Sequence, residues 1–275
     1  SNLLFSNADI DKMEVTYPHL FQHLWTMREE LIPYLPTIEK CLLEFDFEND
    51  KFYLVKEAVD KMEYILKTFN EPNFAKDVNA LIIKYCIPYR PNNPFKDLYF
   101  HLLPKYQDII LDDIMKALIL PFEQSMFYFN MRYELGSGFG YGAGPLFQCD
   151  NDRLKNACKE FPNILPERFA DMCPVCNFKK NGEQMELSDF FIWLVNNYGD
   201  NEKVLQSLSS NFGTYSYTGV GSMKGYYMDR QNMFKPLLRH ENPKVADWAK
   251  NMYKAEEQEV NYQQMMDDYR DMTKG

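Results

Sequence analysis

The sequence has no cluster of basic residues. Its densest basic run is the pair Lys179 and Lys180, and the chain of 275 residues has a formal net charge of −10. A negative average potential repels nucleic-acid backbones and anionic lipid unless basic side chains are locally concentrated. We therefore expect no nucleic-acid partner.

The sequence also has no long uncharged apolar run. Its most hydrophobic stretch is 109–129, which contains four ionisable residues: Asp112, Asp113, Lys116 and Glu123. Charges at this density oppose insertion into a bilayer. The first residues show no basic region followed by an apolar run, which a signal peptide would have. We expect a cytoplasmic protein without a membrane partner.

Cysteine is sparse, with six residues scattered through the chain. This usage is typical of reduced thiols in the cytoplasm rather than of a disulfide framework. Cys173 and Cys176 form one C-x-x-C pair, and Cys149 and Cys158 lie upstream, so four thiolates could surround a zinc ion. The irregular spacing favours buried thiols, and we expect no cofactor, with a zinc-stabilised module as the alternative.

Histidine is rarer still, with four residues. His19 and His23 are one helical turn apart, so both could face a metal. No third ligand is evident nearby, and no Glu follows the first His as in a zincin. The alternative function, a helical metal-dependent enzyme, would use this pair or Cys173 and Cys176.

Five of the twelve glycines lie in GSGFGYGAGP, Gly136 to Pro145. A phosphate-binding P-loop needs a lysine after its last glycine, and a dinucleotide fingerprint needs a preceding strand; both are missing here. The chain also lacks a nucleophile-elbow motif and a kinase catalytic loop. We expect a connector at 136–145, and no enzyme.

Helical periodicity is what the sequence has in abundance. Apolar residues of 55–69 step by three and four, and Asn49 or Asp50 could cap that helix. A strand signal is found only at 214–217, between glycines. Helices are expected at about 18–31, 36–45, 51–69, 73–86, 94–103, 105–135 with a break at Pro121, 151–160, 166–172, 188–198 and 202–210.

Short Pro, Asn and Gly joints between these helices favour an all-α fold, an irregular α-solenoid of stacked helical hairpins. The alternative is a compact multi-helix bundle. Composition changes at the glycine-rich segment, from long aromatic-rich helices to shorter ones. We therefore expect an N-terminal helical region at 1–135, a connector at 136–145 and a C-terminal helical region at 146–275.

The segment FKPLLRHENPKVADWAKNMYKAEEQE, Phe234 to Glu259, resembles a unit of the HEAT-like helical repeats. Asn242 would cap the second helix and Pro243 would open it. Upstream, LSSNFGTYSYTGVGSMKGYY resembles a glycine-and-aromatic connector found in C-terminal regions of large bacterial helical-repeat proteins. The inward face of the second helix would consist of Val245, Trp248, Ala249 and Met252.

This resemblance implies a non-catalytic protein-binding, scaffold or regulatory protein whose partner is another protein, and it brings no catalytic residues. Aromatic rings set among glycines are the candidate contacts, because they can be buried on association. These candidate partner-binding residues are Phe139, Tyr141, Tyr215, Tyr217, Tyr226 and Tyr227.

The C-terminal stretch AEEQEVNYQQMMDDYRDMTKG predicts a charged helix with a thin apolar stripe. Terminal repeats must close the end of a solenoid, so capping of the stack is the favoured role of this stripe. A contact with a partner is the alternative, since flexible thioethers suit adaptable surfaces. The stripe consists of Val260, Met265, Met266, Tyr269 and Met272.

Overall fold

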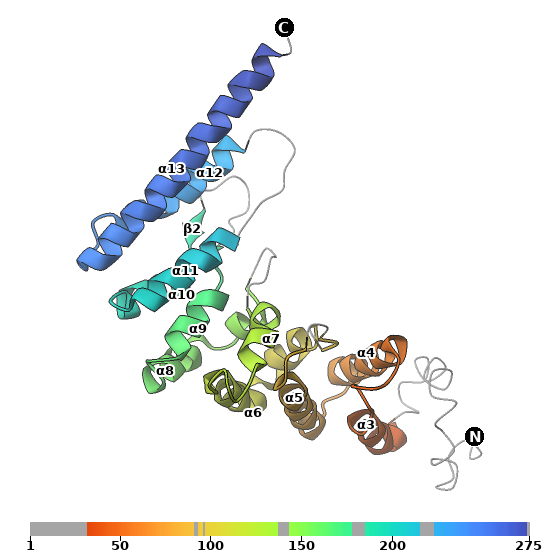
Figure 1. The fold of residues 1–275 in the computed structure, drawn as a ribbon. Coiled ribbons are helices and arrows are strands. Elements are labelled where there is room, and N and C mark those ends of the chain that lie inside the picture. Colours follow the sequence, from red (N-terminus) through yellow and green to blue (C-terminus); the bar gives the residue numbers. More distant parts are fainter. Residues whose placement is uncertain are drawn as a thin grey trace. The chain divides into compact units, whose positions relative to one another are not determined.

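The computed structural model describes residues 32–90, 93–95, 97–136, 143–177, 185–214 and 223–273. These residues are predominantly helical, so the all-α class is confirmed (Figure 1). The solenoid arrangement stays a prediction. The chain divides into two compact units, Ser1–Ile82 and Ile83–Gly275, and the joint expected at 136–145 lies inside the second unit.

The described part of the first unit contains the 3-10 helix η2 (Ile32–Tyr34), then α3 (Leu35–Leu43), α4 (Phe52–Thr68) and the greater part of α5 (Pro72–Cys86). The apolar stripe expected on α4 is buried from Val55 to Leu66. The expected cap is wrong, because Lys51 occupies that position and makes no side-chain capping bond. Asn49 instead donates from its backbone and side-chain nitrogens to Asp46.

The second unit continues from the end of α5 through a series of short helices and one small hairpin. Its elements are α6 (Tyr99–Ile119), α7 (Phe127–Leu135), η3 (Pro145–Gln148), α8 (Asn151–Glu160), α9 (Leu165–Met172), β1 (Cys176–Asn177), β2 (Glu186–Leu187), α10 (Asp189–Tyr198), α11 (Glu202–Thr214), α12 (Lys224–Met233), η4 (Lys235–Leu237) and α13 (Pro243–Met272).

Helix α6 joins two segments that were expected to be separate. Pro104 lies inside it, and Tyr106 leaves helical geometry at φ −125° and ψ 17°. A proline ring removes one backbone hydrogen bond and crowds the preceding turn, so a kink here is the ordinary outcome. The break expected at Pro121 is confirmed, since α6 ends at Ile119 and α7 begins at Phe127.

The strands were not predicted. Strands β1 and β2 pair antiparallel, with Cys176 opposite Leu187, and each has two residues. Two residues are too few for an alternating pattern to be visible. The strand expected at Thr214 to Tyr217 is wrong at its first residue, because Thr214 ends α11; residues 215–217 lie outside the described residues.

Two glycines of the glycine-rich segment are required by close packing of the backbone. A Cβ added to Gly136 would lie 2.5 Å from the carbonyl oxygen of Arg132 and 2.7 Å from that of Met172. A Cβ added to Gly144 would overlap the carbonyl of Gly136 itself. The two ends of the segment therefore meet, where only glycine leaves enough space.

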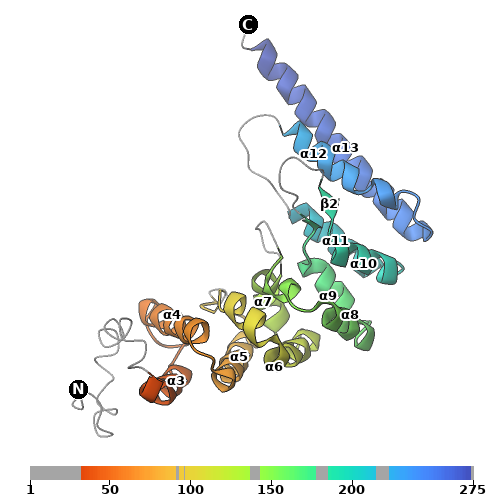
Figure 2. The same cartoon turned by 180° about the vertical axis from the view of Figure 1, so that it is seen from behind.

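Helices α12 and α13 lie side by side in both views (Figures 1 and 2). Arg230 on α12 donates from Nε and Nη2 to the carboxylate of Glu256 on α13, each bond measuring 2.8 Å. The guanidinium also lies 4.2 Å from the centroid of the Phe212 ring. This pair fixes the register of the two helices.

The expected start of α13 is confirmed. The Asn242 side chain accepts a hydrogen bond from the backbone of Lys244, and Pro243 is the first helical residue. Val245 and Ala249 are buried, and the Trp248 indole donates to the Ser209 hydroxyl at 2.8 Å. Within the described residues, none of the helices has both the length and the apolar character needed to cross a bilayer.

Candidate functional site

A groove lies between α6 and α8. Its volume is about 370 Å³. An apolar floor and a polar rim can be distinguished among its lining residues. The floor consists of Leu111, Met115, Ala157 and Phe161, and the rim consists of Asp112, Lys116, Arg153, Asn156 and Glu160.

The first turn of α8 is fixed against α6 by backbone and side-chain hydrogen bonds. Asp150 caps α8 by accepting from the backbone nitrogen of Asp152 at 2.9 Å. The backbone nitrogen of Asp150 donates to the Gln107 side chain on α6 at 3.1 Å. Because the cap of α8 is hydrogen-bonded to α6, it sets the direction of α8 relative to α6. This direction determines the width of the groove between the two helices.

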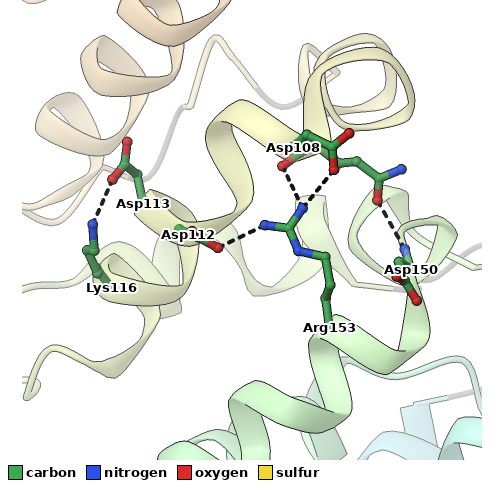
Figure 3. Close-up of polar contacts among 7 residues, drawn as sticks. Asp108, Asp112, Asp113, Lys116, Asp150 and Arg153 are labelled. Carbon is green, nitrogen blue, oxygen red and sulfur yellow. Dashed lines mark hydrogen bonds and ion pairs between the residues drawn. The ribbon is translucent and has the colours of Figure 1, made fainter.

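Arg153 reaches from α8 to a pair of carboxylates on α6 (Figure 3). Its Nη1 donates to Asp108 at 3.0 Å, and its Nη2 donates to Asp112 at 2.9 Å. Asp108 and Asp112 are one helical turn apart, where like charges repel, and the guanidinium between them offsets that repulsion. Nη1 also donates to the Gln107 carbonyl at 3.3 Å, so the arginine is held in one orientation.

The ion pairs of this cluster are open to solvent. The side chain of Asp108 is 91% exposed and that of Asp112 is 77% exposed. Asp113 pairs along α6 with Lys116 at 3.2 Å. Exposed pairs of this kind contribute at most about 1 kcal/mol each to stability. These pairs therefore contribute little to holding the fold together.

The groove combines an apolar floor with a charged rim. Leu111 and Met115 are buried at its base, and Ala157 leaves space because its side chain is a single methyl group. An apolar side chain placed there would lose contact with water, while the charged rim would meet polar groups on both sides of it.

The cysteines predicted as an alternative zinc site do not form one. All four are described, and no three His, Cys, Asp or Glu side chains of the described residues gather where they could hold a metal. Cys149 and Cys158 are buried, and burial raises the pKa of their thiols to about 11 and about 12. Burial also raises the pKa of Cys173, and Cys176 begins β1. These residues pack as small apolar side chains.

Two of the six aromatic candidates are described, and their setting differs from the expectation. Tyr226 and Tyr227 belong to helix α12 rather than to a connector. Their ring centroids are 5.3 Å apart, and the Tyr226 hydroxyl accepts from Arg230 at 3.2 Å. Tyr226 therefore contacts the arginine that joins α12 to Glu256 of α13. The other four, Phe139, Tyr141, Tyr215 and Tyr217, lie outside the described residues, as do His19 and His23.

The groove between α6 and α8 was missed by sequence reasoning. In the sequence, Asp112 and Asp113 were considered only as charges that oppose insertion into a bilayer. The available signal was the spacing of Asp108 and Asp112, since carboxylates one turn apart favour a cation between them. Which cation would fill that place was not visible, because Arg153 lies on a different helix.

No family model, curated protein or solved structure matches the chain. The likeness to HEAT-like repeats therefore stays an expectation from the sequence, and the site has to be interpreted from its own geometry.

Proposed function

We propose that this protein is a non-catalytic helical module that binds another protein, and that the groove between α6 and α8 receives an apolar side chain of that partner. The observation that carries the proposal is the combination of an apolar floor with a rim containing both charge signs. Protein interfaces combine a desolvated apolar centre with a polar periphery in this way.

The partner segment that fits is an apolar side chain with polar or charged residues on each side. Lys116 on α6 offers positive charge and Glu160 on α8 offers negative charge, whereas Asp112 and Arg153 are paired with each other. A partner with one acidic and one basic flank would be oriented by such a rim, because like charges facing each other oppose the reversed direction. A scaffold or regulatory role in the cytoplasm, in an α-solenoid of HEAT-like type, belongs to the same proposal.

Filling the groove tests this function. Ala157→Trp places a large ring over the floor, and Lys159→Trp places the same ring on α8 at an exposed position that does not line the groove. A photo-crosslinking residue introduced at Asn156 of the full chain in its host should capture a discrete protein. Ala157→Trp should abolish that adduct, whereas Lys159→Trp should retain it.

The captured protein is then purified and titrated directly. We expect Ala157→Trp to weaken its binding about tenfold or more, equivalent to about 1.4 kcal/mol. Equal adducts from a crosslinker at Asp60, an exposed position of the first unit that does not line the groove, or unchanged affinity in Ala157→Trp, would show that the groove does not bind the partner.

A further inference from the structure

The groove between α6 and α8 is lined almost entirely by helical residues. Four lining residues belong to α6 and four to α8, and Phe161, which follows α8, completes the set. The N–H and C=O groups inside an α-helix bond to one another. At the end of α8, the Phe161 nitrogen donates to the Ala157 carbonyl at 2.9 Å, and the Phe161 carbonyl accepts from Leu165 at 3.1 Å. The floor therefore leaves few backbone groups available to an incoming chain.

Most of the charged side chains on the rim already have partners. Asp112 on α6 pairs with Arg153 on α8 at 2.9 Å (Figure 3). Lys116 pairs with Asp113 at 3.2 Å (Figure 3). Glu160 differs, because its exposed side chain has no hydrogen bond or ion pair within the part of the chain that the structure describes. This carboxylate is therefore free to pair with a cation of a partner.

These contacts favour one conformation of the bound segment. An extended chain does not pair its own N–H and C=O groups, and those turned toward the groove would lose water without gaining a partner. Asn156 is the amide side chain on the rim, and its oxygen already accepts from Lys159 at 3.5 Å. An α-helix satisfies its own backbone and presents only side chains to a groove. A helical segment therefore fits better than an extended one.

The floor also has the spacing of a helix. Leu111 and Met115 are one turn apart on α6, and Ala157 and Phe161 have the same separation in sequence. Four helical residues rise about 6 Å. Two apolar side chains at positions i and i+4 of a partner helix have the same rise and lie on one face. Ala157 has the smallest side chain of the floor and allows that helix to approach closely.

We infer that the groove binds a short amphipathic helix of the partner protein. Two apolar residues one turn apart lie on the floor, and a lysine or arginine of the same helix pairs with Glu160. This ion pair gives the helix a preferred orientation in the groove. The inference rests on the proposed binding function of the groove and adds the conformation and the charge of the bound segment.

A displayed library of random peptides tests the conformation without knowledge of the partner. Peptides are selected for binding to the full chain, and those that also bind Ala157→Trp are removed. The enriched peptides should have apolar residues spaced by three and four. Proline in the middle of an enriched peptide should weaken binding at least tenfold in fluorescence anisotropy, because it breaks a helix. Proline at the first helical position should be tolerated.

Glu160→Lys tests the charge. It should weaken binding of a lysine-containing enriched peptide about fivefold, and glutamate in place of that lysine should restore binding. Glu160→Gln, which removes the charge without reversing it, should have an intermediate effect. The matched control is Glu257→Lys, at an exposed position of α13 that does not line the groove, and it should leave binding unchanged. Circular dichroism of every variant reports whether the fold is retained.

The outcomes separate this inference from the function on which it rests. Enriched peptides with alternating apolar residues, or with tolerance of a central proline, would overturn the helical ligand and leave the binding function intact. Unchanged binding in Glu160→Lys would overturn the ion pair. A library without any peptide that distinguishes the full chain from Ala157→Trp would also overturn the helical ligand, and the crosslinking experiment at Asn156 then decides separately whether the groove binds a protein.

Discussion

Arg230 and Glu256 form a buried ion pair whose members depend on each other. Both side chains are 7% exposed. Burial by itself lowers the pKa of Arg230, but hydrogen bonds to Glu256 and Tyr226 outweigh it, so the pKa is raised and the guanidinium stays charged. A buried charge is tolerated because its partner is present, and removal of one member leaves the other uncompensated.

Arg230→Met should lower the free energy of unfolding by about 3–5 kcal/mol, because it leaves Glu256 buried without a counter-ion. The double variant Arg230→Met with Glu256→Leu should recover most of that loss. Urea unfolding followed by circular dichroism measures both. Lys250→Met, which removes an exposed pair with Asp247, is the control and should cost less than about 1 kcal/mol. A similarly small loss in Arg230→Met would contradict this account.

Glu39 gives the first unit a pH-dependent stability. Burial, followed by repulsion from Glu71 and Asp77, raises the pKa of Glu39 from 4.5 to about 7. The folded state therefore holds this proton more tightly than the unfolded state does. The resulting stabilisation is fully present below pH 4.5 and is lost as the pH rises through about 7.

Glu39→Gln should make the stability of the first unit less dependent on pH between 5 and 8, since the amide cannot ionise. Thermal unfolding at a series of pH values measures the effect. Lys40→Gln, on the adjacent exposed position of α3, is the control and should leave the slope unchanged. An unaltered slope in Glu39→Gln would show that another group titrates.

At the scale of elements, sequence reasoning was most successful for the bounds of α8 and for the start of α13. Helix α8 has the expected bounds, Asn151–Glu160, and α13 begins at Pro243 as expected. Sequence reasoning failed where tertiary contacts determine the bounds of a helix. Helix α6 continues through Pro104, and its described surroundings keep Leu102, Leu103 and Tyr106 buried around the kink. Local propensity could not show that this burial would outweigh the helix-breaking tendency of proline.

The cap of α13 can be tested in isolation from its packing. Asn242→Ala removes the acceptor for the Lys244 backbone and the 2.9 Å bond to Asp200. We expect a loss of about 1 kcal/mol in the free energy of unfolding, typical of an N-cap. Asn251→Ala, at an exposed position inside the same helix, should be neutral or slightly stabilising because alanine favours helix. Equal effects of the two substitutions would argue against a capping role.

At the scale of the whole molecule, charge and helical class were accessible from composition and periodicity, but the groove was not. Arg153 and Asp108 are 45 residues apart in the chain. Their meeting depends on how α6 and α8 pack, which no local pattern contains. The same holds for Met265, Tyr269 and Met272 of α13, which could be identified in the sequence as part of an apolar stripe although their exposure could not.

The net charge of −10 leads to a prediction for the intact chain. The protein should not bind a 20-base-pair duplex DNA measurably at 150 mM salt, because the sequence has no run of basic residues that would offset the repulsion. Fluorescence anisotropy with labelled DNA measures this, and a basic DNA-binding protein serves as the positive control. Saturable micromolar binding would contradict the prediction.

The meeting of Gly136 and Gly144 also has a practical consequence. Because the two ends of this segment touch, a longer segment between them would not require the flanking helices to separate. An epitope tag inserted between residues 139 and 140 should therefore leave the thermal midpoint nearly unchanged. The same tag placed between residues 110 and 111, inside α6, should abolish folding.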